Sequence, residues 1–254
     1  MITLGLLALF TVWLAPLTGQ APQELDFVPV GVRYPADALP SRRALDLEAI
    51  RRAHFNVVAL SDLAEPTAPL QRTAARLAGE PLEVLNVRST EIGRVPIETA
   101  TAADNVREAA WTLLASGARG VVFVDWSGLQ QNPAALAEAS AFAEAITRNM
   151  ALYAPLRRAE PSAARTITIT GDDQKNVEAR WLESADALLL VAVNHGSQAR
   201  DITLTFPRDV PEAVWQNMLT GSSVNFVAGP SGPFYEHTFP PHDVLVLMIR
   251  KRWK

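Results

Sequence analysis

Apolar and polar residues follow two different periods along the chain, and the change of period divides the sequence in two. Between residues 27 and 155, short runs that are apolar throughout alternate with longer runs that have the spacing of an amphipathic helix. After Pro161, apolar residues recur at every second position. The first pattern predicts a parallel sheet covered by helices, and the second predicts antiparallel strands.

The first half contains four predicted strand–helix units. The predicted strands are residues 27–34, 55–62, 82–87 and 119–128. The predicted helices are residues 41–53, 69–79, 103–117 and 133–155. Gly79 and Gly117 close two of these helices, and Pro133 begins the last one. We therefore expect an α/β fold with a parallel β/α domain over residues 24–158.

The second half predicts an antiparallel β-sandwich over residues 164–250. In the run "VEARWLE", Val177, Ala179 and Trp181 face one way and the charged residues mostly face the other. The run "ARDITLTFP" repeats this alternation. The runs "ALLLVAVN" and "DVLVLMI" are apolar at every position, as central strands would be.

The N-terminal run "ITLGLLALFTVWLAPLTGQA" carries no charge. Its apolar core, from Ile2 to Ala15, is shorter than the roughly 20 residues that a membrane-spanning helix needs. Pro16 and the small residues after it predict a cleaved signal peptide over residues 1–21, and a short membrane anchor is the alternative. We expect a periplasmic or secreted protein that has no stable membrane span after cleavage.

Composition and residue spacing exclude several classes of function. The chain has no cysteine, which excludes disulfides, thiolate metal sites and a cysteine nucleophile. Its net charge is −4, so a nucleic-acid partner, which needs a basic face, is not expected. The four histidines show no metal-ligand spacing, and the glycine-rich run "GPSGPF" opens no helix. We expect neither a metal nor a cofactor.

Acidic residues follow three of the four predicted parallel strands. Because ligands bind at the carboxyl ends of such strands, Asp62, Glu91 and Asp125 are candidate catalytic residues. Arg33, Tyr34 and Trp126 follow strands at the same edge and are candidate substrate contacts. Carboxylates beside aromatic rings suit a sugar site. Aspartate is also a favoured helix N-cap, so Asp62 and Asp125 have a structural alternative, whereas glutamate caps poorly.

Several motifs resemble clan-A glycoside hydrolases, especially the family 42 β-galactosidase type. The run "TEIG" followed by "NVREAAWTLLASGARGVVFVDWSG" is similar to the last two units of that barrel. The resemblance implies that Glu91 is the nucleophile and Trp126 the aromatic that ends the eighth strand. The run "GVRYPADALPSRRALDLEAIRRAHFNVVAL" resembles the first two units, with His54 where glycine is usual. The second half resembles the β-sandwich that follows such barrels.

Two departures from the family leave the activity open. A full (β/α)₈ barrel takes roughly 250 residues, about twice the length of the β/α half here. The family's acid/base glutamate follows an asparagine, and no Asn-Glu dipeptide occurs in this sequence. If the protein is an enzyme, we expect a retaining O-glycoside hydrolase whose hydrolysis is weak or lost. The alternative is a non-catalytic module that binds carbohydrate or a protein.

A shortened barrel would also expose the face that normally points into the barrel. That face would carry Val57, Val84 and Val122, and an apolar surface of this kind needs a cover. Within the chain, the cover is either the β-sandwich folding back or the helices at 69–79 and 134–146 lying on both faces of a flat sheet, and we expect the helices. The alternative is a homodimer in which two half-barrels pair.

Overall fold

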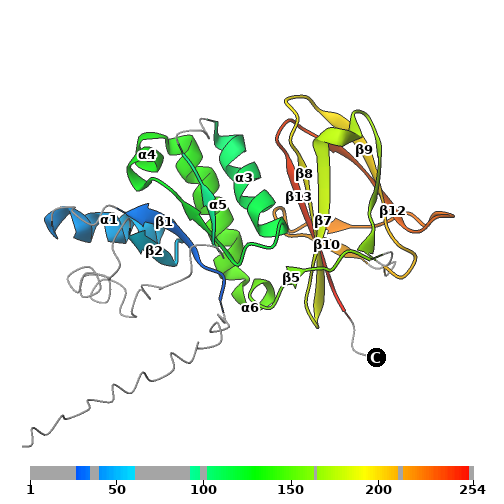
Figure 1. The fold of residues 1–254 in the computed structure, drawn as a ribbon, viewed down its shortest axis with the longest axis horizontal. Coiled ribbons are helices and arrows are strands. Elements are labelled where there is room, and N and C mark those ends of the chain that lie inside the picture. The colour runs from blue at the N-terminus through cyan, green and yellow to red at the C-terminus, as the bar shows by residue number, and fades with distance from the viewer. Residues whose placement is uncertain are drawn as a thin grey trace, which may run out of the picture.

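A computed structural model describes residues 27–34, 40–60, 92–97, 102–162, 165–210 and 214–251 (Figure 1). The predicted signal peptide, the helix predicted at 69–79 and the strand predicted at 82–87 lie outside the described residues. Asp62, Val84 and Glu91 also lie outside them. In the described part of the chain, no helix has the length and the apolar character needed to cross a membrane.

The first half forms a sheet of parallel strands in the order β2-β1-β4-β3. The strands are β1 (Val30–Tyr34), β2 (Val57–Leu60), β3 (Ile92–Val95) and β4 (Gly120–Phe123). The first strand therefore lies beside the last one, as the first and eighth strands do in a closed β/α barrel. In the described residues the sheet is open at β2 and β3, so a shortened barrel is not confirmed.

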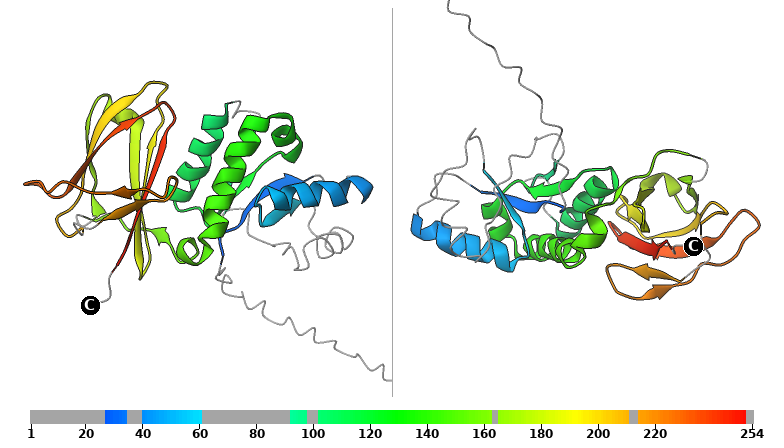
Figure 2. Two further views of the ribbon diagram at one scale, coloured as in Figure 1. Left: turned by 180° about the vertical axis from the view of Figure 1, so that it is seen from behind. Right: turned by 90° about the horizontal axis from the view of Figure 1, so that it is seen from below.

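The described helices of this half pack on one face of the sheet (Figure 2). They are α1 (Pro40–Arg52), α3 (Ala103–Ala115), α4 (Trp126–Gln131), α5 (Pro133–Arg148) and the short α6 (Met150–Tyr153). Their apolar residues share one core with Val30, Val32 and Phe123 of the sheet. Just after α1, His54 has a φ of 62°, which is a left-handed conformation that favours glycine.

The opposite face of the sheet carries Val57 and Val122, which pair with Gly31 in neighbouring strands. Both valines are buried, with exposed fractions of 4% and 6%. The described helices, α5 among them, pack on the other face. The helix predicted at 69–79 lies outside the described residues, so the expectation that the two helices cover both faces stays a prediction. Whether the protein dimerises stays a prediction.

Three predicted element boundaries in this half were wrong. The strand predicted at 119–128 ends at Phe123, and the chain turns into α4 at Trp126. The helix predicted at 133–155 is divided at Asn149, which lies between α5 and α6. Strand β3 begins at Ile92, although no strand was predicted between residues 87 and 119.

The second half contains two antiparallel sheets that share a hydrophobic core. The larger sheet has the order β11-β10-β13-β8-β7-β5, and the smaller has the order β12-β9-β6. The larger sheet comprises β5 (Arg157–Arg158), β7 (Val177–Glu183), β8 (Ala187–Asn194), β10 (Trp215–Asn217), β11 (Ser223–Val224) and β13 (Val244–Arg250). The smaller sheet comprises β6 (Thr168–Gly171), β9 (Arg200–Thr205) and β12 (Phe234–Phe239).

The central strands β8 and β13 join the two halves of the molecule. Leu190 and Leu247 point into the core between the two antiparallel sheets. Leu189 and Val246, on the other face of the same strands, belong to the core of the β/α half. Helix α3 lies beside this face (Figure 1), which explains why both strands are apolar at nearly every position.

Candidate functional site

Four of the six predicted site residues are described, and all four lie at the carboxyl edge of the parallel sheet. Arg33 and Tyr34 end β1, and Asp125 and Trp126 follow β4. Because β1 and β4 pair in parallel, these ends lie side by side. The four residues therefore lie together at one edge of the sheet. The environment of each side chain decides what it can do there.

Asp125 is the N-cap of helix α4. Its backbone is extended, and its Oδ1 accepts a hydrogen bond of 2.9 Å from the backbone N–H of Ser127. This bond satisfies one of the amide groups that have no partner inside the helix. A Cβ added at Gly128 would lie 2.8 Å from Asp125 Oδ2, so α4 packs closely on the carboxylate. Asp125 is therefore a helix N-cap, which is the structural alternative to a catalytic role.

Trp126 is buried rather than open to a ligand. Its exposed fraction is 2%, and Phe55 lies against it edge-on with the ring centroids 6.4 Å apart. A sugar platform needs an exposed ring face, because the pyranose ring must stack on it. The expectation that Trp126 is a sugar platform was wrong, because the start of α4 turns the residue into the core.

Tyr34 belongs to a buried hydrogen-bond network around Asp46. The Tyr34 hydroxyl, 1% exposed as a residue, donates to Asp46 Oδ2 at 2.9 Å. Gln130 donates to Asp46 Oδ1 at 3.2 Å, and Arg42 donates to Oδ2 at 3.3 Å. Burial, and then the bond to Asp46, raise the pKa of the Tyr34 phenol far above its usual value. The network holds α1 and α4 to β1, which leaves Tyr34 no open face for a substrate.

The remaining predicted site residues are Arg33, Asp62 and Glu91. Arg33 is half-buried on the face of the sheet opposite the helices, and its role stays a prediction. Asp62 and Glu91 lie outside the described residues. Ile92, which follows Glu91 in the sequence, pairs with Gly120 at the amino end of β4. The strand predicted at 82–87 lies outside the described residues as well, so the role of Glu91 stays a prediction.

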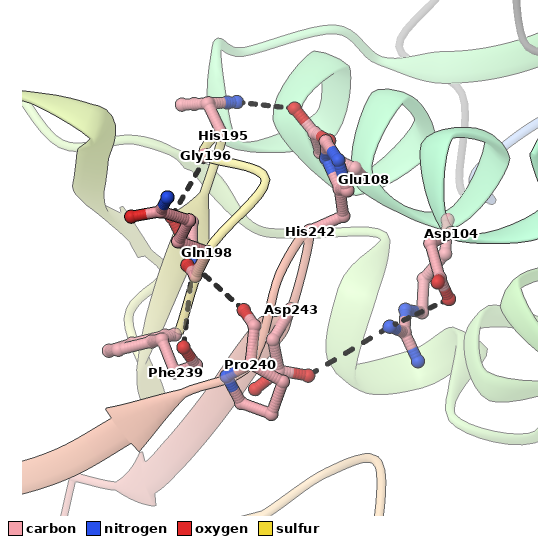
Figure 3. Close-up of polar contacts among 11 residues, drawn as sticks. Asp104, Glu108, His195, Gly196, Gln198, Phe239, Pro240, His242 and Asp243 are labelled. Carbon is pink, nitrogen blue, oxygen red and sulfur yellow. Dashed lines mark hydrogen bonds and ion pairs between the residues drawn. The ribbon is translucent and has the colours of Figure 1, made fainter. Parts of the chain in front are cut away.

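A second polar cluster lies between α3 and the antiparallel sheets (Figure 3). Glu108 of α3 accepts hydrogen bonds from Nδ1 of His195 at 2.6 Å and from Nδ1 of His242 at 2.7 Å. His195 also faces Glu178 of β7, with Nε2 and Oε2 3.4 Å apart. Nearby, Arg107 lies 3.4 Å from Asp104 and 3.9 Å from Asp243. Sequence reasoning missed this cluster, because its members are far apart in the chain.

The charges of this cluster stabilise one another. Burial acts to raise the pKa of Glu108, but the hydrogen bonds from His195 and His242 outweigh it and hold that pKa below its usual range. The bond to Glu108, opposed by burial, raises the pKa of His195. Among the described residues, no group of three acidic or histidine side chains is arranged to hold a metal ion. The cluster is suited to joining the two halves.

A hollow of about 310 Å³ lies on the outer face of the smaller antiparallel sheet. Asp201 and Thr203 of β9, with Glu236 and Thr238 of β12, line it, and Thr203 pairs with Glu236 across the strands. Their neighbours in β9, such as Ile202, point into the core, so these four side chains point outward. Thr238 donates a 2.6 Å hydrogen bond to Asp201, which fixes one carboxylate beside the hollow.

The same outer face carries one aromatic residue beside the polar group. Phe234 is two residues from Glu236 in β12 and pairs with Thr205. It is half-buried, and a Cβ added at Gly229 would lie 3.0 Å from its ring. Hydroxyl and carboxylate groups next to a ring are the groups that bind sugars. The alternating polar positions of "DITLTF" and "FYEHTF" were the sequence signal for this face.

Comparison with known proteins gives only distant similarities. No protein-family model matches the sequence, and no curated protein sequence matches it. A GH42 β-galactosidase from G. stearothermophilus aligns with 34% of this chain and 10% of its own, at 10% identity and a TM-score of 0.23. A GH30 endoxylanase from Clostridium papyrosolvens aligns with 80% of this chain and 51% of its own, at 13% identity and a TM-score of 0.39.

A family 30 subfamily 8 xylanase from Clostridium acetobutylicum is similar at the same level. It aligns with 83% of this chain and 52% of its own, at 12% identity and a TM-score of 0.38. The chain thus spans about half the length of both xylanases and a tenth of the β-galactosidase. The family 42 type is not distinguished from other glycoside hydrolases. TM-scores below 0.5 at such low identity carry no argument about the activity of this chain.

Proposed function

We propose that this protein is an exported carbohydrate-binding protein with a glycoside-hydrolase-like architecture and without effective hydrolysis. The architecture we propose is a shortened β/α barrel followed by a β-sandwich. The strand order, in which β1 pairs with β4, supports this proposed architecture. The sequence motifs that resemble clan-A glycoside hydrolases are the second support.

The proposed loss of hydrolysis rests on Asp125, the described carboxylate at the carboxyl edge of the parallel sheet. Retaining hydrolysis needs two carboxyl groups about 5 Å apart, one as nucleophile and one as acid/base. Asp125 is engaged as the cap of α4, and the Asn-Glu dipeptide of the family is missing.

The hollow over Asp201, Thr203, Glu236 and Thr238 is the observation that carries the proposed binding function. Its volume, about 310 Å³, is at the lower end of the range for small-ligand sites, which begins near about 300 Å³. Its carboxylates accept hydrogen bonds and its threonine hydroxyls donate and accept them, so the groups complement the hydroxyls of a sugar. Phe234 lies on the same outer face, two residues from Glu236 along β12.

Titration calorimetry with galacto- and xylo-oligosaccharides tests the proposal. We expect saturable binding that Asp201→Ala and Glu236→Ala each weaken about tenfold, because each removes hydrogen bonds to a charged group. Asp186→Ala, which removes an exposed carboxylate elsewhere on the β half, serves as the matched control. In parallel, aryl glycosides with good leaving groups should be hydrolysed slowly or not at all.

Two results would overturn the proposal. One is the absence of saturable binding across the oligosaccharide panel. The other is rapid turnover of unactivated disaccharides that Glu91→Gln abolishes, since it would mean that the chain has a working acid/base pair.

A further inference from the structure

The outer face of the smaller antiparallel sheet continues beyond the hollow that we propose as a sugar site. Strands β9 and β12 lie on the side of the molecule far from the β/α half (Figure 1), so that half does not cover this face. Phe234 of β12 pairs with Thr205 of β9, and Thr205 pairs with Thr168 of β6. Because directly paired residues point to the same face of a sheet, these three side chains form a row beside the hollow.

Val227 adds an exposed apolar side chain to the end of this row. It forms an isolated antiparallel bridge with Phe234, in which each backbone N–H donates to the other residue's carbonyl oxygen at 2.9 Å. The preceding residue, Phe226, packs on the core between the two sheets, so Val227 points outward. The exposed fraction of Val227 is 56%, and Phe234 is half-buried. The row therefore begins with two apolar side chains and continues with two threonine hydroxyls.

This row is the next set of outward-facing side chains after those of the hollow. Phe234 lies two positions from Glu236 along β12, which corresponds to about 6.8 Å, since each residue of a strand rises about 3.4 Å. Tyr235, between them, points inward and contacts Phe226, with the ring centroids 5.9 Å apart. A single sugar ring in the hollow leaves Val227 and Phe234 uncovered, whereas a second ring bonded to the first reaches them.

The chemistry of the two sets of side chains indicates the class of sugar. The face of a pyranose ring is apolar and packs on apolar side chains, whereas its hydroxyl groups need donors and acceptors. Val227 and Phe234 supply the apolar contact, and Thr205 supplies a hydroxyl beside it. The hollow is lined by two carboxylates, and no lysine or arginine is among its described lining residues, so it repels a sugar that carries an acidic group.

We propose that Val227 and Phe234 form a second subsite next to the hollow, and that the ligand is an oligosaccharide without acidic groups rather than a single sugar. This inference rests on the proposed function, because the hollow is the first subsite. One ring occupies the hollow with its hydroxyls on Asp201 and Glu236. The adjoining ring packs on Val227 and turns its hydroxyls toward Thr205.

Titration calorimetry of the full chain with xylo- and galacto-oligosaccharides of one to six units tests the second subsite. For wild type we expect the affinity to rise about tenfold between one and three units and then to level off, because the second ring adds contacts. Val227→Ser should lower the affinity for three to six units about fivefold and leave the affinity for single sugars unchanged. Single sugars, which bind weakly, are measured by competition against a longer oligosaccharide.

Two comparisons control this experiment. Val214→Ser makes the same change at a valine that is 61% exposed beside β10 of the larger sheet, and it should alter the affinity for no chain length. Oligogalacturonides, which carry a carboxylate on every ring, should bind at least about tenfold more weakly than galacto-oligosaccharides of the same length. Asp201→Ala should weaken binding at every length, because it acts in the hollow.

The outcomes separate the second subsite from the proposed function. Three results would overturn the second subsite alone: an affinity that does not change with chain length, a loss in Val227→Ser that is equal for single sugars and longer chains, or oligogalacturonides that bind as tightly as galacto-oligosaccharides. The equal loss would mean that the substitution distorts β12 instead of removing a contact. No saturable binding at any length would overturn the proposed function itself.

Discussion

The carboxyl edge of the parallel sheet and the outer face of the smaller antiparallel sheet contain similar residue types in opposite environments. At the carboxyl edge, Tyr34 and Asp46 are buried and bonded to each other, and Asp125 is bonded to a backbone amide. On the outer face of β9 and β12, Asp201 and Glu236 are exposed beside a hollow. A polar residue after a strand thus indicates a site only when the elements that follow leave it open.

The largest effect should come from the tryptophan at the carboxyl edge. Trp126→Ala removes a ring that is 2% exposed, so it should lower the free energy of unfolding by about 3–5 kcal/mol. Phe234→Ala, on the open face, should cost clearly less, because Phe234 is only half-buried. Urea unfolding monitored by circular dichroism measures both. A small loss for Trp126→Ala, with loss of sugar affinity, would restore its predicted role as a platform.

Tyr34→Phe should have the next largest effect. The change removes one donor from the buried Asp46 carboxylate, and a hydrogen bond to a charged group contributes about 1.5–3 kcal/mol. Arg42→Gln is the matched comparison, because Arg42 donates to the same carboxylate but its side chain is 62% exposed, so its loss should cost less. Equal losses of unfolding free energy for the two variants would mean that Asp46 is not shielded from water.

The capping role of Asp125 predicts a smaller loss that depends on the substituted residue. Asp125→Ala should lower the unfolding free energy by about 1 kcal/mol, whereas Asp125→Asn should nearly preserve it, since asparagine caps as well as aspartate. If Asp125 were instead a catalytic carboxylate, Asp125→Ala and Asp125→Asn would be equally inactive in an assay of aryl glycoside hydrolysis. Denaturant unfolding and that assay together separate the two roles.

The Glu108 cluster predicts a weak dependence of stability on pH. The pKa of His195 is raised from 6.5, so its contribution is complete below about pH 6.5 and is lost as the pH rises through the raised value. The pKa of Glu108 is lowered from 4.5, so its contribution is complete above about pH 4.5 and is lost as the pH falls through the lowered value. The contacts that both groups make are therefore strongest between about pH 4.5 and 6.5.

The size of this effect should be below about 1 kcal/mol, because the histidines are partly exposed and the charges are screened. Glu178, on β7, also faces His195 and supports its protonated form. Glu108→Gln should flatten the pH profile of the unfolding free energy, and Glu160→Gln, an exposed acid elsewhere, should not. An unchanged profile in Glu108→Gln would assign the pH dependence to other groups.

Sequence periodicity predicted the strands in which the burial of each face keeps the same pattern along the whole strand. The strands β7, β8 and β13 were located closely, because alternation or continuous apolar character reports directly which faces are buried. The short strands β10 and β11 were missed, because a few residues of mixed character carry too little periodicity. Strand β4 was predicted too long, since Val124 and Trp126 are still apolar while Asp125 already caps α4.

The candidate sites depended on contacts that are distant in sequence. Glu108 and His195 are 87 positions apart, and Tyr34 meets an aspartate from the next helix, so neither pairing has a local signal. The residue types at the carboxyl edge were predicted, but their burial was not, because it depends on how α1 and α4 pack. The outer face of β9 and β12 had a local signal in its alternating threonines and acids, but none of these acids ends a predicted parallel strand.

One titration compares the two regions directly. An oligosaccharide that binds wild type is titrated into wild type, into an Asp201→Ala/Glu236→Ala double variant and into Asp125→Asn. Each protein is first checked for a native circular dichroism spectrum. The account predicts that the double variant binds at least about tenfold more weakly than wild type and that Asp125→Asn binds within about twofold of it. Sugar affinity that is lost in Asp125→Asn and kept in the double variant would contradict the account and return the binding site to the carboxyl edge of the parallel sheet.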